Sequence, residues 1–295
     1  MLKNSKTVRI VTVGSLVKDV KLMRKTYRER KSPEYWTARW DQIPVHAPAE
    51  GHDCYPLLYA NMVVCDQDGE VLELGCGPGR LVRHYHAKGI KIVGVDNVAA
   101  AITKLQACDP QLQVVQADAR TLPFETGRFA TVLCFGVYHS LEDDVVAAIR
   151  ETFRVLRPGG RLCAEFRSDS LHNRMIDYYK GAGKRATEFH KWNYRRRDAR
   201  AMLVDAGFFI EGEHPALNMP LLYHVPWLRH PSQRQSDEHS ARISGYRLQP
   251  WLQTLHSIGL RLLPGLLANQ YIFLCRKPGV QDQRREYTAT KVKSS

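Results

Sequence analysis

Three glycines at alternate positions follow a short apolar run, and this is the strongest chemical signal in the chain. The run is Val71–Leu74, and the glycines are Gly75, Gly77 and Gly79. Glycine has no Cβ, so the backbone can turn sharply there and approach a bound ligand closely. An apolar run that ends in glycines predicts a buried strand, and the residues after Gly79 predict a helix. Strand, glycine turn and helix in this order form the nucleotide cradle of α/β proteins.

The spacing of these glycines bears on which nucleotide the cradle holds. Dinucleotide-binding folds carry Gly-x-Gly-x-x-Gly or Ala, because a small last residue lets the helix pack close to the strand. Here that position is Arg80, which has a long charged side chain. The pattern is instead Gly75-x-Gly77-x-Gly79. The chain therefore departs from the dinucleotide fingerprint.

Strands and helices alternate around this turn. Between residues 70 and 168 we expect helices over 81–88, 98–107 and 143–156. Alternation of this kind predicts βαβ units and a parallel sheet. We therefore predict an α/β fold with a doubly wound, mostly parallel, seven-stranded sheet. The expected strands are 71–74, 91–96, 113–117, 130–136, 161–166, 208–211 and 271–275.

The remaining regions are irregular and predict the domain organisation. We expect a basic N-terminal helical or lid region over 1–60, a domain over 61–277 with insertions at 168–197 and 214–268, and a polar, disordered tail over 278–295. In the first region Leu16, Val20, Met23 and Tyr27 recur at helical spacing among basic residues. Such a helix either binds an anionic surface or packs on the domain with a solvated basic face.

Four blocks in this order resemble the class I S-adenosylmethionine-dependent methyltransferases. They are Val71–Gly79, Val93–Asp96, Ala117–Ala119 and Phe135–Leu141, and Arg154–Arg161 follows them. The likeness covers residues 60–168 well, and 198–213 with 270–277 more loosely. It implies the Rossmann-like methyltransferase fold with an antiparallel edge strand and helical insertions. It also implies S-adenosyl-L-methionine as the cofactor.

The resemblance implies roles for individual residues. Asp96 takes the ribose hydroxyls, and a carboxylate suits them because it accepts two hydrogen bonds from a vicinal diol. Asp118 meets the adenine amino group, and Glu73 supports the methionine ammonium or the glycine loop. Asp96 and Asp118 also have structural interpretations, as a helix cap and a turn residue. The expected cofactor-binding residues are Glu73, Gly75, Cys76, Gly77, Gly79, Asp96, Asn97, Asp118, Ala119, Phe135 and Tyr138.

The implied reaction is an in-line displacement of methyl from a sulfonium, which requires no metal. Alignment in a water-poor pocket supplies most of the acceleration, since proximity can contribute roughly 7–11 kcal/mol. A hydroxyl or amine acceptor must also lose a proton. His139 is the candidate catalytic base because histidine titrates near neutral pH. The alternative role for His139 is to shape the pocket.

The acceptor is the less determined half of the reaction. The net charge of +13 attracts anions, so an anionic group on a small-molecule acceptor is compatible with it. The segment 184–197 mixes bases with aromatic residues, which suits RNA as an alternative acceptor. The long apolar stretches near 221–223 and 260–267 favour a small or lipid-like acceptor. A third hypothesis for the function is a non-catalytic module that binds S-adenosylmethionine.

Composition bears on the compartment. Seven cysteines are scattered singly, without Cys-x-x-Cys, which favours reduced thiols in a cytoplasmic protein. The chain contains no run of eighteen apolar residues, so the sequence predicts no transmembrane helix. We also expect no secretory signal, because the N-terminus lacks its pattern. The sequence leaves the oligomeric state open.

Overall fold

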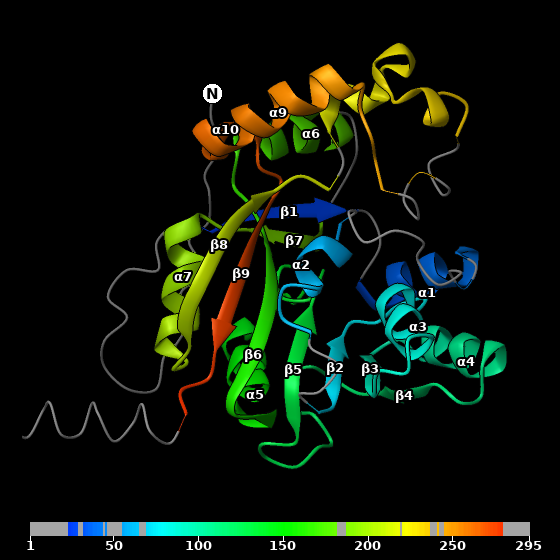
Figure 1. Ribbon diagram of the computed structural model, residues 1–295, viewed down its shortest axis with the longest axis vertical. Helices are drawn as coiled ribbons and strands as arrows, with labels where there is room; N and C mark the ends of the chain where they lie inside the picture. The colour runs from blue at the N-terminus through cyan, green and yellow to red at the C-terminus, as the bar shows by residue number, and fades with distance from the viewer. Residues whose placement is uncertain are drawn as a thin grey trace, which may run out of the picture.

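The computed structural model of the protein describes residues 23–28, 32–43, 45, 55–64, 69–181, 187–218, 220–236, 241 and 245–279. These residues form a central seven-stranded sheet, helices on both of its faces, and a separate two-stranded ribbon (Figure 1). The disordered tail predicted over 278–295 lies outside the described residues from residue 280 onward.

The strands of the central sheet are β2 (Val71–Leu74), β3 (Ile92–Asp96), β4 (Gln113–Gln116), β5 (Phe129–Cys134), β6 (Leu156–Arg167), β8 (Phe209–Ala216) and β9 (Gln270–Arg276). Their spatial order is β4-β3-β2-β5-β6-β9-β8. All neighbours are parallel except that β9 runs antiparallel to both β6 and β8. The predicted doubly wound, mostly parallel sheet is therefore confirmed. The antiparallel strand is β9, one position in from the edge strand β8.

Burial explains why the central strands read as apolar runs. Every residue of β2, β3 and β5 is buried. Parallel strands covered on both faces need apolar side chains on both, so they do not alternate with polar residues. The carboxyl ends of these three strands lie together at one end of the sheet, where such folds bind ligands.

Two apolar clusters attach helices to the two faces of the sheet. Leu57 of α2 (Leu57–Ala60), Leu81 of α3 (Arg80–His86) and Leu105 of α4 (Ala99–Cys108) belong to one cluster. Ile149 of α5 (Val145–Val155) and Leu203 of α7 (Arg196–Asp205) belong to the other. Helices therefore cover both faces, as expected for a doubly wound sheet.

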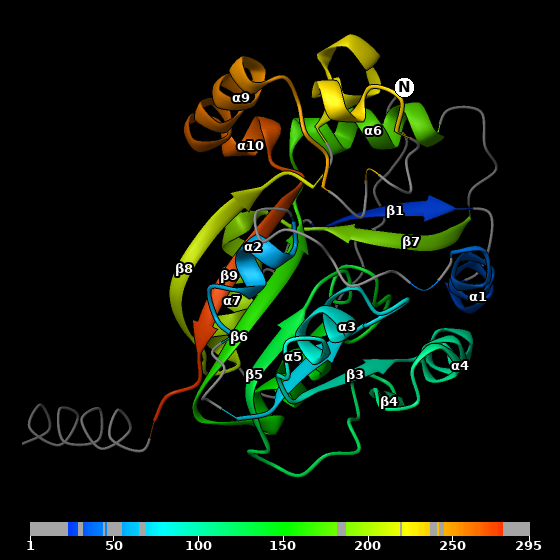
Figure 2. The ribbon, with the colours of Figure 1, turned by 45° about the vertical axis from the view of Figure 1, so that its right-hand side comes forward.

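A ribbon and several short helices lie beyond the carboxyl end of the sheet (Figures 1 and 2). The ribbon pairs β1 (Arg24–Arg28) with β7 (Glu188–Asn193) in antiparallel register. Helix α1 (Ser32–Gln42) lies beside α4. We call the remaining helices the cap: α6 (Leu171–Gly181), η1 (Leu221–His224), η2 (Pro226–Leu228), η3 (Pro231–Gln233), α9 (Pro250–Leu262) and α10 (Pro264–Leu267).

The prediction of a helix across residues 16–27 is wrong for residues 24–27, the part of this segment whose fold the structure describes as a strand. Residues 24–28 form β1, whose partner is β7. Strand pairing with a segment far along the chain overrides the local helical spacing of Met23 and Tyr27. Residues 1–22 lie outside the described residues.

Candidate functional site

A cavity of about 220 Å³ lies at the carboxyl ends of β2, β3, β4 and β5. Trp36 and Trp40 of α1 form part of its wall, and the last residues of β3 together with the segments that follow the four strands form the rest. Such a position is the ligand-binding crevice of open α/β sheets. The lining residues are Trp36, Trp40, Gly75, Val95, Asp96, Asn97, Val98, Ala117, Asp118, Ala119, Phe135, Gly136, Val137, Ser140 and Leu141.

Backbone hydrogen bonds hold the glycine turn against the end of β3. The amides of Gly75 and Cys76 both donate to the carbonyl of Val95, at 2.7 and 2.9 Å. The amide of Gly79 donates to the carbonyl of Cys76 at 2.9 Å, which closes the turn before α3 begins. The turn is thus fixed at both of its ends.

Each of the three glycines is required by its conformation and its surroundings. Gly75, Gly77 and Gly79 have φ values of 73°, 47° and 85°, in the left-handed region that favours glycine. A Cβ on Gly75 would overlap the side chain of Val137, and a Cβ on Gly79 would overlap that of Leu105. The spacing that departs from the dinucleotide fingerprint therefore has a steric basis in this fold.

The carboxylate of Asp96 joins the glycine turn to the end of β3. Its Oδ2 accepts a hydrogen bond from the amide of Gly77, and its Oδ1 accepts one from the amide of Val98, both at 2.9 Å. Burial raises the pKa of Asp96, and these two hydrogen bonds oppose the rise because they stabilise the charged form. Each carboxylate oxygen has a second acceptor site, so the group can still accept two hydrogen bonds from a ligand. Asp96 also lines the cavity.

Glu73 supports the start of α3 from within β2. Its Oε2 accepts a hydrogen bond from the amide of Val82 at 2.8 Å. The side chain is buried, and burial raises the pKa of Glu73 to about 8. A buried carboxyl group with a single amide donor is largely protonated near neutral pH. A cationic ligand group beside it would favour its ionised form.

A second cavity, of about 170 Å³, lies on the other side of the glycine turn. It shares Trp40, Gly75 and Phe135 with the first cavity. Glu73, Cys76, Gly77 and Arg80 also line it, so it presents both an acidic and a basic side chain. The two cavities are therefore neighbours that share part of their walls.

Contacts of its indole ring and of its backbone carbonyl position Trp40. A Cβ on Gly77 would lie 3.0 Å from the indole ring, so the ring packs directly on the glycine turn. The ammonium of Lys104 on α4 donates to the carbonyls of Trp40 and Asp41, at 2.7 and 2.6 Å. Lys104 thereby holds the last turn of α1, where a cation also suits the helix dipole.

Asp118 lies at the rim of the cavity and is already paired. Both carboxylate oxygens accept hydrogen bonds from the guanidinium of Arg120, the shortest at 2.6 Å. Oδ1 also accepts a hydrogen bond from the amide of Arg120 at 2.9 Å. The hydrogen bonds from Arg120 lower the pKa of Asp118, so the carboxyl group is ionised at neutral pH.

The other predicted cofactor-binding residues divide into two groups. Asn97, Ala119 and Phe135 line the first cavity, and Cys76 lines the second. Tyr138 lies outside both cavities, because its ring is fully buried and its hydroxyl bonds Thr152 Oγ1 at 2.8 Å. The sequence predicts Tyr138 at the cofactor, but the structure places it in the hydrophobic core beside α5.

His139 is buried and lines neither of the two cavities. Its Nδ1 lies 3.6 Å from Glu165 Oε1 and has no hydrogen-bond partner among the described residues. Tyr55 donates a hydrogen bond to the other oxygen of Glu165. Burial lowers the pKa of His139 well below its usual value, and the charge of Lys191 lowers it further. The imidazole is therefore neutral at physiological pH.

The basic and aromatic segment predicted over 184–197 does not form a stacking surface where it is described. The ring of Tyr194 is fully buried, and Trp192 is 8% exposed. Arginines 195–197 form ion pairs, with Asp198 or with Glu213. Residues 182–186 lie outside the described residues. Within 187–197 the aromatic rings therefore belong to the core.

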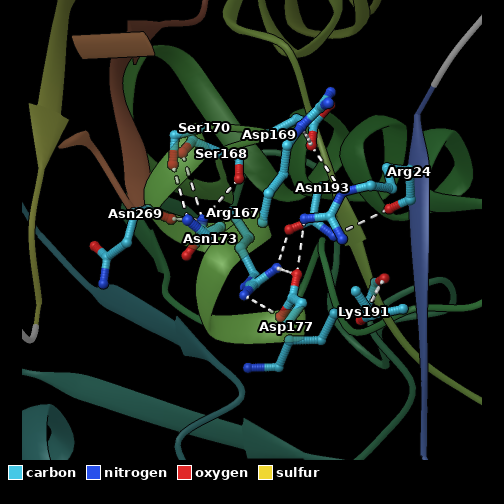
Figure 3. A network of polar contacts seen from close by, with 12 residues as sticks. Arg24, Arg167, Ser168, Asp169, Ser170, Asn173, Asp177, Lys191, Asn193 and Asn269 are labelled. Carbon is cyan, nitrogen blue, oxygen red and sulfur yellow. Dashed lines mark hydrogen bonds and ion pairs between the residues drawn. The ribbon is translucent and has the colours of Figure 1, made fainter. Parts of the chain in front are cut away.

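An ion-pair network fastens the ribbon to the end of β6 (Figure 3). Arg167 donates to both carboxylate oxygens of Asp177, at 3.0 and 2.7 Å. Arg24 on β1 donates to the same carboxylate at 2.7 Å and to Asp169 at 2.8 Å. Asn193 on β7 accepts from Arg167 and donates to the carbonyl of Arg24 at 3.1 Å. These contacts join β1, β6, β7 and α6 to one another at the carboxyl end of the sheet.

Two further properties concern metals and membranes. Among the residues that the structure describes, no three histidine, cysteine, aspartate or glutamate side chains gather as metal ligands. No helix in this part of the chain is long and apolar enough to span a bilayer.

The sequence analysis missed several residues of the site. Trp40 is one of them, and its i, i+4 spacing from Trp36 was the available signal. Asn218 lines the second cavity but follows β8, at the far edge of the sheet, so no local pattern indicates it. Val137, Ser140 and Leu141 belong to the segment after β5.

Comparison with known proteins agrees with this geometry. A family model described as a methyltransferase domain matches residues 71–160. An uncharacterized methyltransferase of Mycobacterium tuberculosis is 32% identical over 118 residues, which are 40% of this chain and 48% of the relative. A probable S-adenosylmethionine-dependent methyltransferase of the same species is 29% identical over 160 residues, 54% of each protein. The chain thus spans about half the length of these curated relatives.

The fold also matches solved structures. The crystal structure of an S-adenosylmethionine-dependent methyltransferase from Methanosarcina mazei aligns with a TM-score of 0.53 and 17% identity, covering 76% of this chain and 98% of that one. Strands β2, β3, β4 and β5 and the glycine turn after β2 all lie within the residues that the family model matches. Residues 71–160 thus match a methyltransferase domain, and over about half of its length the chain is similar to S-adenosylmethionine-dependent methyltransferases.

Proposed function

We propose that this protein transfers a methyl group from S-adenosylmethionine to an oxygen or nitrogen nucleophile of a small-molecule acceptor. The observation that carries the proposal is the Asp96 carboxylate, which bonds the amides of Gly77 and Val98 and still lines the cavity. This arrangement fixes the glycine turn and leaves acceptor sites for the two hydroxyls of a ribose.

The two cavities suit the two halves of this cofactor. The first, bounded by Asp96 and Asp118, matches a nucleoside in its donors, acceptors and apolar walls. The second, which contains Glu73 and Arg80, offers a carboxyl group and a guanidinium for the ammonium and carboxylate of an amino acid, and the bound ammonium would favour the ionised form of Glu73. When bound, S-adenosylmethionine would supply an electrophilic methyl group. The protein's own part is to hold the cofactor with Asp96 and Glu73 and to exclude water with Trp36 and Trp40.

Two observations support a small acceptor over RNA. The described part of the basic and aromatic segment buries Trp192 and Tyr194, so these rings cannot stack on nucleotide bases. The ribbon and the cap lie beyond the carboxyl end of the sheet (Figure 2). A long nucleic acid would need an open basic groove there, whereas a small molecule would not.

Calorimetry and labelled-methyl transfer together test this proposal. We expect S-adenosylmethionine and S-adenosylhomocysteine to bind, with a thermal shift of the protein. We expect the label to enter the small-molecule fraction of an extract rather than its RNA or protein. Absence of cofactor binding would contradict the enzyme proposal, and label in RNA would contradict the acceptor class. Cofactor binding without transfer to any fraction would favour a non-catalytic binding module.

A further inference from the structure

Helix α9 carries an apolar stripe on its exposed side. Trp251, Leu255, Ile258 and Leu262 are spaced four, three and four residues apart, which places them on one helical face. Their side chains are 59, 59, 49 and 72% exposed. The opposite side of the helix holds the half-buried Leu260, which packs against the main core. The helix therefore has apolar residues facing the core and a second apolar face on the surface.

The stripe belongs to a larger apolar surface of the cap. Trp227 on η2 is 72% exposed, and Leu266 on α10 is 44% exposed. Tyr178 and Tyr179 on α6 are 73 and 70% exposed. Helices α6, α9 and α10 lie together on the side of the ribbon that faces away from the sheet (Figures 1 and 2). Single exposed apolar residues are ordinary, but several on adjacent helices mark an interaction surface.

The charge around this surface indicates what it binds. No aspartate or glutamate occurs between Glu238 and Asp282, a segment that includes all of α9 and α10. Arg261 is the cationic residue of α9, beside the polar Thr254 and Ser257 at the edge of the stripe. The whole chain carries a net charge of +13. Two copies of this chain would repel one another, whereas an anionic surface would attract the cap.

We propose that the cap docks on the surface of a lipid bilayer that contains anionic lipids, with the α9 stripe inserted at the headgroup level. An interfacial helix of this kind combines leucine, isoleucine and tryptophan on one side with basic and small polar residues beside them. Indole rings favour the boundary between headgroups and acyl chains, where Trp227 and Trp251 would lie. The inference goes beyond the proposed methyl transfer and does not depend on it.

Vesicle binding by the whole chain of 295 residues tests the proposal. We expect co-sedimentation with vesicles of phosphatidylcholine and phosphatidylglycerol, weaker binding to phosphatidylcholine alone, and further weakening at high salt. The variant Leu255→Gln with Leu262→Gln should bind at least about tenfold more weakly, because each change removes an apolar side chain from the inserted face. The matched control is Thr254→Gln with Ser257→Gln, which changes two exposed polar residues of the same helix and should bind as wild type.

Three outcomes would overturn the proposal. They are no binding to either vesicle, equal loss of binding in the two double variants, and a solution dimer that the leucine variant alone dissociates. The last would show that a second copy covers the stripe. Cofactor affinity measured by calorimetry on the same variants should match the wild-type value. A failure of vesicle binding is therefore distinguishable from a failure of the proposed methyl transfer.

Discussion

The carboxylate of Asp96 accepts a hydrogen bond from the amide of Gly77 at 2.9 Å, across a separation of nineteen residues in the sequence. This contact joins the end of β3 to the turn after β2, so the acid and the glycine turn form one structural unit. The same carboxylate caps the segment before α4 through the amide of Val98. The capping and ligand-binding interpretations of Asp96 are therefore compatible, because the two amides use only part of its acceptor capacity.

Replacing Asp96 with asparagine should weaken cofactor binding. The amide side chain has one acceptor oxygen, and hydrogen bonds to charged groups contribute about 1.5–3 kcal/mol each. We expect the affinity for S-adenosylhomocysteine to fall by roughly ten- to a hundredfold, measured by isothermal titration calorimetry. Asp143→Asn, at an exposed position, is the matched control. Unchanged affinity in the Asp96 variant would remove Asp96 from the proposed ribose site.

Replacing Glu73 with glutamine should flatten the pH dependence of stability without cofactor. Because burial raises the pKa of Glu73 from 4.5 to about 8, the folded state holds this proton more tightly than the unfolded state. The stabilising contribution is complete below about pH 4.5 and declines as the pH rises to about 8, by up to about 1.4 kcal/mol per pH unit. Urea unfolding at several pH values checks this, with the exposed Glu142→Gln as control. Identical slopes in wild type and Glu73→Gln would refute the prediction.

Asp118 should contribute to selectivity more than to affinity. Its carboxylate is partly exposed and bonded to Arg120, so water and the guanidinium compete with a ligand amino group. We expect Asp118→Ala to weaken S-adenosylhomocysteine binding by about 0.5–1.5 kcal/mol, the net value of one hydrogen bond. The variant should also lose the preference for the adenosine ligand over its inosine analogue. A retained preference in competition titrations would place the adenine amino group elsewhere.

His139 should act by positioning its neighbours rather than by accepting the substrate proton. The imidazole lines neither cavity, and its backbone carbonyl accepts the amide of Trp192 at 2.8 Å. We expect His139→Gln to lower kcat modestly and to leave the shape of the pH–rate profile unchanged. Measuring kcat from acidic to alkaline pH in both proteins decides this. Loss of the acidic limb in the variant alone would restore His139 as the general base.

Lys104 should govern how long the cofactor stays bound. Replacing it with methionine removes the ammonium that holds the Trp40 and Asp41 carbonyls, while the aliphatic stem is kept. The last turn of α1 should loosen, and S-adenosylhomocysteine should dissociate several-fold faster in stopped-flow measurements. Lys91→Met, at an exposed position beside β3, is the control. Equal dissociation rates in the two variants would show that α1 is held by other contacts.

The chain's local patterns predict the central sheet well and the surrounding elements poorly. Strands β2, β3 and β5 are mainly apolar runs bounded by glycines and turns, so each one is visible in isolation. The helical spacing of Met23 and Tyr27 predicts a helix through residues 24–28. In the structure this segment is a strand that pairs with β7. A strand that forms by pairing with a segment far along the chain leaves little local trace.

By itself the sequence determined the fold class, the resemblance to methyltransferases and the acids at the ends of the strands. These follow from periodicity, from glycine conformation and from motif order, all of which act over short distances along the chain. Only the tertiary structure decided which side chains meet. It placed Trp40 on Gly77, paired Asp118 with Arg120, and turned Tyr138 into the core. The reason is that side-chain direction at the carboxyl ends depends on packing between distant segments, which no local pattern encodes.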